Sequence, residues 1–222
     1  MSRQDAASTL DFERSGPVDA AAGATVAVLL HGRGSDMHDL QGLRSLLPES
    51  WVLVTPQAPF PGADWGYGPG SAWYRYREED HVYEDTLQES LAKLDAFLAG
   101  LPGLVGFEPG RLVIGGFSQG GTVSLAYALS RPGSVAAALN FSGFLASSVD
   151  LDETGASPPR TPLFWGHGVA DPAIPIALAQ KGRNRLRRAG AMLLVRDYRV
   201  GHWIVEQEVW DAIAMVEEAS PS

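Results

Sequence analysis

The chain contains no cysteine among its 222 residues. This absence excludes disulfides, zinc sites built from cysteine and cysteine nucleophiles. Long apolar runs are missing as well, because no stretch approaches the roughly 20 consecutive apolar residues of a membrane helix. The N-terminal segment also lacks an apolar core of signal-peptide length. We therefore expect no integral membrane contact and a cytoplasmic protein.

Basic residues are scarce, with 17 Lys and Arg against 26 Asp and Glu and a formal net charge of −9. Such a balance disfavours nucleic acids and anionic membranes as partners. The hydrophobic fraction of 45% is sufficient for a sizeable core. We expect residues 1–222 to form a single domain, with residues 1–20 as an N-terminal extension or a first edge strand. Both a monomer and a homodimer are compatible with the sequence.

Short apolar runs predict β-strands that are covered on both faces. They lie at residues 25–30, 51–55, 111–114, 135–141, 162–165 and 191–195. Leucines at spacings of three and four predict an amphipathic helix over residues 84–101, and a similar apolar spacing from Val205 to Val216 predicts a last helix. This alternation favours an α/β fold with a mostly parallel sheet and helices on both faces.

Two segments match neither pattern, namely residues 58–77 and residues 147–162. The first is rich in proline, glycine and aromatic residues, and the second contains Pro158, Pro159 and small polar residues. Both are longer than the usual connection, and long loops tend to be functional or mobile.

Residues 115–121, GGFSQGG, place one serine where a predicted strand turns into a helix. The pattern G-x-S-x-G is typical of a nucleophile elbow. Glycines are needed on both sides because the nucleophile has a strained backbone and larger side chains would collide. The following helix offers free N–H groups to a developing oxyanion. Ser118 is therefore the candidate nucleophile.

A serine nucleophile needs a base, which in this kind of fold follows both the serine and the acid in the chain. Of the five histidines, only His167 and His202 follow Ser118. His202 comes after the last predicted strand and just before the last helix, so we favour it as the base. For His167 we favour a structural role in the turn after its strand.

The acid that orients the base must lie between Ser118 and His202. The candidates are Asp150, Asp152, Glu153, Asp171 and Asp197. The first three are interpreted as solvated loop charges. Position alone leaves Asp171, in a loop before a proline, and Asp197, at a strand end, as competing hypotheses.

Residues 29–34, LLHGRG, end the first strong strand with two glycines around Arg33. This segment is similar to the H-G-G-G type that supplies one oxyanion N–H in lipases and esterases. Together with the serine elbow, it indicates an oxyanion hole.

The chain resembles the phospholipase/carboxylesterase family of α/β hydrolases, which includes the acyl-protein thioesterases. The matching segments occur in the family's order at residues 30–34, 55–59, 72–74, 115–121, 141–144, 166–172 and 201–202. The resemblance implies an α/β-hydrolase fold with Ser118 as nucleophile, Asp171 as acid and His202 as base. It also implies oxyanion donors at the backbone N–H groups of Arg33 and Gln119. We expect neither a metal nor a cofactor.

Two features depart from the family pattern. An apolar residue often stands where this chain has Arg33, whose side chain we expect to reshape the mouth of the site. Residues 62–70 are unusually rich in glycine and aromatic residues, which leaves the acyl preference open.

These observations predict a carboxylesterase that cleaves a small-molecule ester of short to medium acyl chain through an acyl-enzyme, in an open site without a large lid domain. The alternatives are a lysophospholipase, an acyl thioesterase and a non-catalytic binding protein. Aromatic side chains near the motifs could form an apolar wall for the substrate or simply cap the core. The candidate substrate-binding residues are Trp65, Trp73, Tyr74, Phe144, Ile174 and Trp203.

Overall fold

A computed structural model of the chain describes residues 10–219, which contain one large, mostly parallel β-sheet. Across the sheet the strands are β1 (Phe12–Ser15), β3 (Val52–Pro56), β2 (Thr25–Leu30), β8 (Arg111–Phe117), β9 (Ala137–Phe141), β10 (Leu163–Gly168) and β11 (Leu193–Tyr198). Only the edge strand β1 is antiparallel to its neighbour. It falls within the region expected to be an extension or edge strand, whereas residues 1–9 lie outside the described residues.

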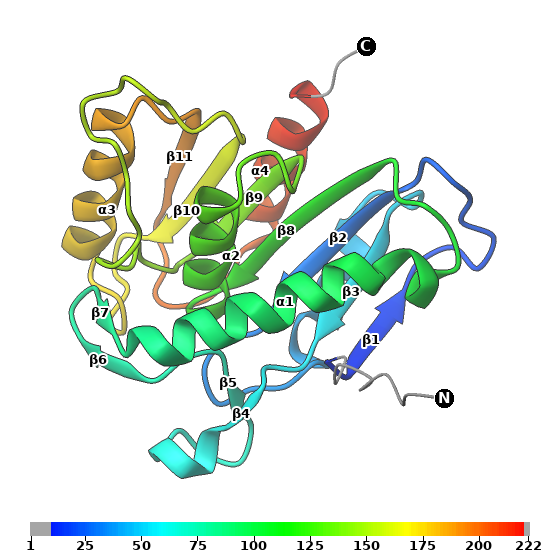
Figure 1. Cartoon of the computed structure of the whole chain (residues 1–222), viewed down its shortest axis with the longest axis horizontal. Helices are drawn as coiled ribbons and strands as arrows, with labels where there is room; N and C mark the ends of the chain where they lie inside the picture. The colour runs from blue at the N-terminus through cyan, green and yellow to red at the C-terminus, as the bar shows by residue number, and fades with distance from the viewer. Residues whose placement is uncertain (1–9, 220–222) are drawn as a thin grey trace, which may run out of the picture.

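Helices cover both faces of this sheet, as the alternating pattern predicted (Figure 1). On one face lie α1 (Glu84–Val105), α2 (Gln119–Ser130) and α3 (Ile176–Arg188), and on the other lie η1 (Asp39–Leu46) and α4 (Glu206–Glu218). Val26 and Val28 pack toward the first group, whereas Ala27 and Leu29 pack toward the second. The strands are apolar on both sides because each side meets a helical layer. No helix within residues 10–219 combines the length and the hydrophobicity needed to cross a bilayer.

Several elements continue beyond their predicted ends. Strand β8 was expected to end at Ile114 but runs to Phe117. Its ladder with β2 continues through the glycines that interrupt the apolar run. Helix α1 continues past Pro102 to Val105, a residue that is buried in the core. Packing of this last turn therefore outweighs the cost of an interior proline.

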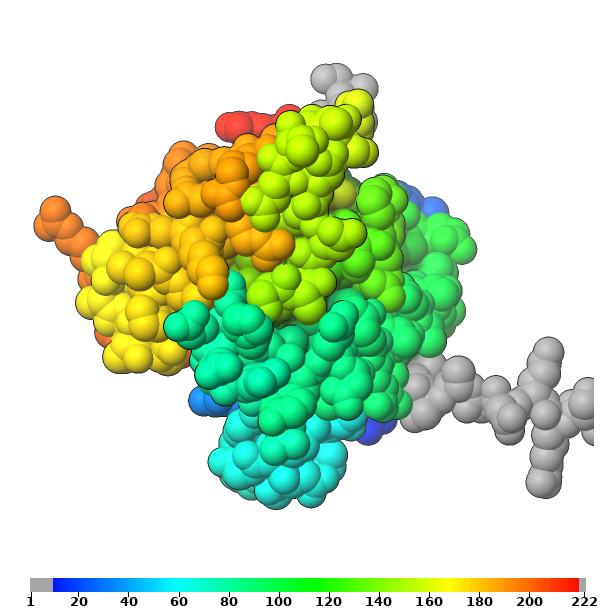
Figure 2. Space-filling model, turned by 60° about the vertical axis from the view of Figure 1, so that its left-hand side comes forward, coloured from blue at the N-terminus to red at the C-terminus, as the bar shows by residue number. Residues whose placement is uncertain are grey.

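The loop expected at residues 58–77 contains short elements of its own. Strand β4 (Phe60–Pro61) pairs with β5 (Ser71–Ala72), and η2 (Gly62–Trp65) lies between them. A second small ladder joins β6 (Tyr76–Glu78) to β7 (His81–Val82). Figure 2 shows the first of these ladders, with its helical turn, as a cyan knob on the surface. Residues 147–162 contain neither helix nor strand, as expected.

Candidate active site

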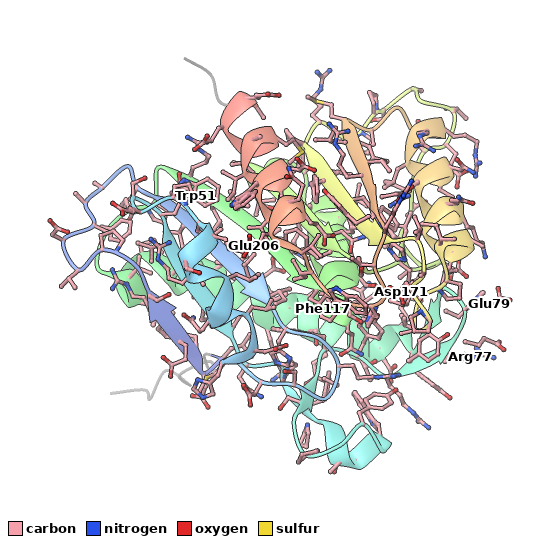
Figure 3. All side chains as sticks on the ribbon, turned by 180° about the vertical axis from the view of Figure 1, so that it is seen from behind. Trp51, Arg77, Glu79, Phe117, Asp171 and Glu206 are labelled. Atoms are coloured by element: carbon pink, nitrogen blue, oxygen red, sulfur yellow. The ribbon has the colours of Figure 1, made fainter. Side chains whose placement is uncertain are left out.

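The loops that follow β2, β8, β10 and β11 carry Arg33, Ser118, Asp171 and His202 respectively. These four strands are parallel, so their carboxyl ends share one edge of the sheet. Ligands of open parallel sheets bind at this edge. In Figure 3, the labelled residues Phe117 and Asp171 mark it.

Ser118 occupies the sharp turn between β8 and α2. Its backbone has φ 53° and ψ −112°, a strained conformation for a residue with a side chain. The turn is held because the Ser118 N–H donates to the Phe141 carbonyl at 2.8 Å. A Cβ on Gly120 would lie 2.0 Å from the Leu30 carbonyl oxygen, so only glycine fits there. This close approach explains the glycine of the elbow motif.

His202 lies between the hydroxyl of Ser118 and the carboxylate of Asp171. Its Nε2 is 2.9 Å from Ser118 Oγ, and its Nδ1 is 2.6 Å from Asp171 Oδ2. The Phe117 ring packs on the imidazole, with 4.7 Å between ring centroids. The structure thus brings together three side chains that are far apart in the sequence.

The carboxylate of Asp171 is buried and fixed by its own loop. Its Oδ1 accepts hydrogen bonds from the N–H groups of Ala173 and Ile174, at 2.8 and 2.9 Å. This leaves Oδ2 to accept the hydrogen bond from His202. Asp197, the competing carboxylate, instead pairs with Arg183 at 2.8 Å. Glu153, which was interpreted as solvated, also has ionic partners, the guanidinium groups of α3.

His167 is fully buried beside this loop. Its Nε2 lies 2.8 Å from the Ile174 carbonyl oxygen and 3.6 Å from Asp171 Oδ2. Burial lowers the pKa of His167, so the ring is neutral near pH 7 and Nε2–H donates to the carbonyl. This contact ties the Asp171 turn to β10, an arrangement that fits the structural role favoured from the sequence.

Two backbone N–H groups near Ser118 are available to a ligand. The N–H of Gln119 is the first of α2 and has no partner within the helix. The N–H of Arg33 makes no backbone hydrogen bond in the described part of the chain. The Gln119 side chain binds the backbone of the loop that contains Trp73 and Tyr74. Its Oε1 accepts a hydrogen bond from the Trp73 N–H, and its Nε2 donates one to the Tyr74 carbonyl.

A cavity of about 750 Å³ opens beside Ser118 and His202. Three of the six candidate substrate-binding residues, Tyr74, Phe144 and Ile174, line it. Sequence reasoning missed several other lining residues: Phe117, Ala177, Leu178 and Lys181. Phe117 stood inside the elbow motif and could have been noticed there, whereas the α3 residues carried no comparable signal.

The other three candidates do not line the cavity. Trp73 is fully buried and donates its Nε1–H to the His31 carbonyl at 3.0 Å. Trp65 packs on Phe60 in the surface knob, with 4.9 Å between ring centroids. Trp203 is 56% exposed and lies against Gly201. In residues 10–219, no group of three or more His, Cys, Asp or Glu side chains is arranged to hold a metal ion.

Comparisons with known proteins agree with this architecture. A family profile described as phospholipase/carboxylesterase matches residues 18–219. An acyl-protein thioesterase 1 of Neurospora crassa is 29% identical over 219 residues, covering 86% of this chain and 84% of that protein. A probable carboxylesterase of Oryza sativa subsp. japonica is 33% identical over 107 residues, covering 47% of this chain but only 40% of that protein. The crystal structure of esterase PE8 superimposes with a TM-score of 0.78 at 26% identity, covering 96% of this chain and all of that one. The fold is therefore the predicted α/β-hydrolase fold, without a large lid domain.

Proposed function

Because the chain belongs to the phospholipase/carboxylesterase family, we propose that it is a serine hydrolase that cleaves carboxylic esters of short to medium acyl chains through an acyl-enzyme. The observation that carries this proposal is the continuous hydrogen-bonded line from Ser118 Oγ through His202 to Asp171, at 2.9 and 2.6 Å. A hydroxyl becomes a good nucleophile only when an oriented base accepts its proton.

In the proposed mechanism, His202 Nε2 accepts the Ser118 proton as Oγ attacks the ester carbonyl. The N–H groups of Arg33 and Gln119 stabilise the oxyanion that forms, with support from the positive end of α2. The imidazolium then protonates the leaving alcohol, and the neutral imidazole later activates the water that releases the acid. Asp171 accepts a hydrogen bond from Nδ1–H throughout, which fixes the tautomer and stabilises the imidazolium.

The cavity wall offers apolar surface to an acyl chain. Tyr74, Phe144 and Ile174 present apolar surface beside Ser118, and α3 adds Leu178. A pocket of this kind holds a ligand mainly by burying apolar surface. We therefore assign the acyl group to the part of the cavity between Phe144 and α3.

Thioester hydrolysis is the second candidate function. The observation that favours it is the alignment with a protein named acyl-protein thioesterase 1 over 84% of that protein's length. Esters and thioesters pass through the same acyl-enzyme, so the triad geometry suits both. A non-catalytic binding protein would not need the Ser118–His202–Asp171 line, and a lysophospholipase has no separate observation in its favour.

The direct experiment measures kcat/KM on 4-nitrophenyl acetate, butyrate and octanoate, and on the matching acyl-thiocholine esters. We expect turnover of the nitrophenyl esters and a fall in kcat of about 10³-fold or more in Ser118→Ala. Ser148→Ala removes an exposed loop serine and serves as the control with unchanged activity. Equal activity of Ser118→Ala and the wild type would refute the proposal, and faster turnover of thioesters would favour the second candidate.

A further inference from the structure

The side chain of Arg33 has no task in the mechanism above, although Arg33 is an exposed residue of the cavity wall. No carboxylate of residues 10–219 lies within 4 Å of its guanidinium group. The other cation of the cavity wall, Lys181, is by contrast paired with Asp80 at 2.8 Å. Arg33 therefore keeps its charge and its N–H donors available to a ligand.

The surface knob holds this guanidinium in place. Its carbon Cζ lies 4.7 Å from the centroid of the Tyr67 ring. Gly34 permits this contact, because a Cβ there would lie 2.2 Å from the Tyr67 carbonyl oxygen. The Gly34 N–H donates to the Ser71 carbonyl at 2.8 Å, and the Tyr67 hydroxyl accepts from the Tyr76 N–H at 2.9 Å. Stacking fixes the plane of a guanidinium while leaving its edge free for hydrogen bonds.

Arg33 also acts on two tyrosines of the cavity wall. Burial raises the pKa of both Tyr74 and Tyr76, and the positive charge of Arg33 acts against that rise in each case. Both tyrosines line the cavity. Two acids line it too, Asp39 and Glu79, but neither is within salt-bridge distance of Arg33. Figure 3 shows Glu79 at the outer edge of the molecule.

We propose that the Arg33 guanidinium, stacked on Tyr67, is an anion subsite that selects esters carrying a carboxylate or phosphate close to the scissile bond. The inference rests on the proposed function and specifies its substrate class. The backbone N–H of Arg33 is the proposed oxyanion donor, so its side chain starts beside the position of the reacting carbonyl, in the lining of the same cavity as Ser118. A planar guanidinium binds carboxylate and phosphate oxygens through two parallel hydrogen bonds, which gives geometric selection as well as attraction.

The test compares charged and neutral esters of the same shape. One pair carries the charge on the alcohol side, 4-acetoxybenzoate and 4-acetoxybenzamide, and another on the acyl side, monophenyl adipate and phenyl adipamate. The readout is the ratio of kcat/KM for the anionic ester to that for its neutral amide. We expect the wild-type ratio to exceed that of Arg33→Leu by about three- to tenfold in at least one pair. Added salt should lower the wild-type ratio and leave that of Arg33→Leu nearly unchanged.

Other variants separate the guanidinium from general effects. Tyr67→Leu removes the stacking partner without changing Arg33 and should also lower the ratio, whereas Arg33→Lys should retain part of it because the charge remains. Arg75→Leu is the matched control, since Arg75 stacks on Tyr83 at 4.4 Å but does not line the cavity. We expect the Arg75 variant to keep both the ratio and the activity of the wild type.

Measuring ligand affinity directly makes this test independent of catalysis. The Kd of each ester and its amide is measured calorimetrically in Ser118→Ala, with and without Arg33→Leu. Weaker binding of the anionic esters alone in the double variant supports the subsite. Failure of the wild type to hydrolyse any ester would refute the proposed function. The affinity measurements would still show whether Arg33 binds the anionic group. Equal ratios in wild type and Arg33→Leu for both pairs, with equal affinities, would overturn the subsite.

Discussion

Asp171 Oδ2 lies 2.6 Å from His202 Nδ1, while Oδ1 of the same carboxylate accepts hydrogen bonds from two backbone N–H groups of its own loop. The carboxylate is thus fixed before it meets the imidazole, and its side chain is fully buried. Because Oδ1 is occupied by the loop, only Oδ2 is left to orient the histidine and to stabilise its charged form. The carboxylate of Asp171 and the imidazole of His202 are therefore coupled by a hydrogen bond that a change of one atom would disturb.

The first prediction concerns this coupling. Asp171→Asn should lower kcat by about 10³- to 10⁴-fold, because the amide favours the wrong imidazole tautomer and no longer stabilises the imidazolium. The measurement is kcat on 4-nitrophenyl butyrate, with the melting temperature as a check on folding. Asp197→Asn is the matched control: it weakens the partner of buried Arg183 and should lower the melting temperature while keeping kcat. Equal losses of kcat in both variants would contradict the assignment.

The second prediction concerns the turn at Ser118, the proposed nucleophile. Gly120→Ala would place a Cβ 2.0 Å from the Leu30 carbonyl oxygen, so the backbone of the elbow must shift. We expect a lower melting temperature and a loss of kcat of at least about tenfold, since small displacements of a nucleophile are costly. Gly42→Ala meets no atom within 4 Å and should behave as the wild type. A Gly120→Ala protein with full activity would show that the elbow tolerates the displacement.

The elbow could be predicted from the sequence because its determinants are local. Strand, serine, glycines and helix follow one another within a short segment, and the structure has β8, Ser118 and α2 in that order. The choice between Asp171 and Asp197 could not be made from position alone. It depends on Arg183, a residue fourteen positions before Asp197 on α3, which neutralises that carboxylate.

The lining of the cavity was harder to predict, because neighbouring aromatic residues point in different directions. Tyr74 faces the cavity, whereas Trp73 turns into the core and donates to the His31 carbonyl. Gln119 fixes this choice by clamping the backbone of both residues. Composition identified an aromatic loop, but only tertiary hydrogen bonds decide which ring meets a ligand.

The third prediction concerns the acyl chain. Ala177 is exposed on α3 and lines the cavity, so Ala177→Trp should fill part of its volume. We expect kcat/KM on 4-nitrophenyl octanoate to fall by about tenfold or more, with a smaller change on the acetate, because only the longer chain loses its contact surface. Gln180→Trp is the control, since Gln180 is exposed on the same helix but does not line the cavity. A parallel fall on both esters would place the acyl chain elsewhere.

The fourth prediction concerns the stability of the helix that follows His202. Glu208, in the first turn of α4, is 1% exposed, and its Oε1 has no hydrogen-bond partner in the described part of the chain. Burial raises the pKa of Glu208 from 4.5 to about 8, with a contribution from the charge of Asp211. Between these two values the folded protein binds a proton that the unfolded chain has released. The free energy of unfolding therefore decreases from about pH 4.5 to pH 8 and then levels off.

Glu208→Gln should remove this pH dependence, because the amide stays neutral at every pH while keeping the shape of the protonated acid. The variant should match the wild type within about 0.5 kcal/mol near pH 5 and exceed its free energy of unfolding by about 1–3 kcal/mol at pH 8. Urea denaturation at a series of pH values measures this difference. Glu206→Gln, an exposed acid two residues earlier on α4, should leave the pH dependence as it is. If the variant gained as much free energy of unfolding at pH 5 as at pH 8, the gain would come from better packing of the amide. The raised pKa of Glu208 would then be contradicted.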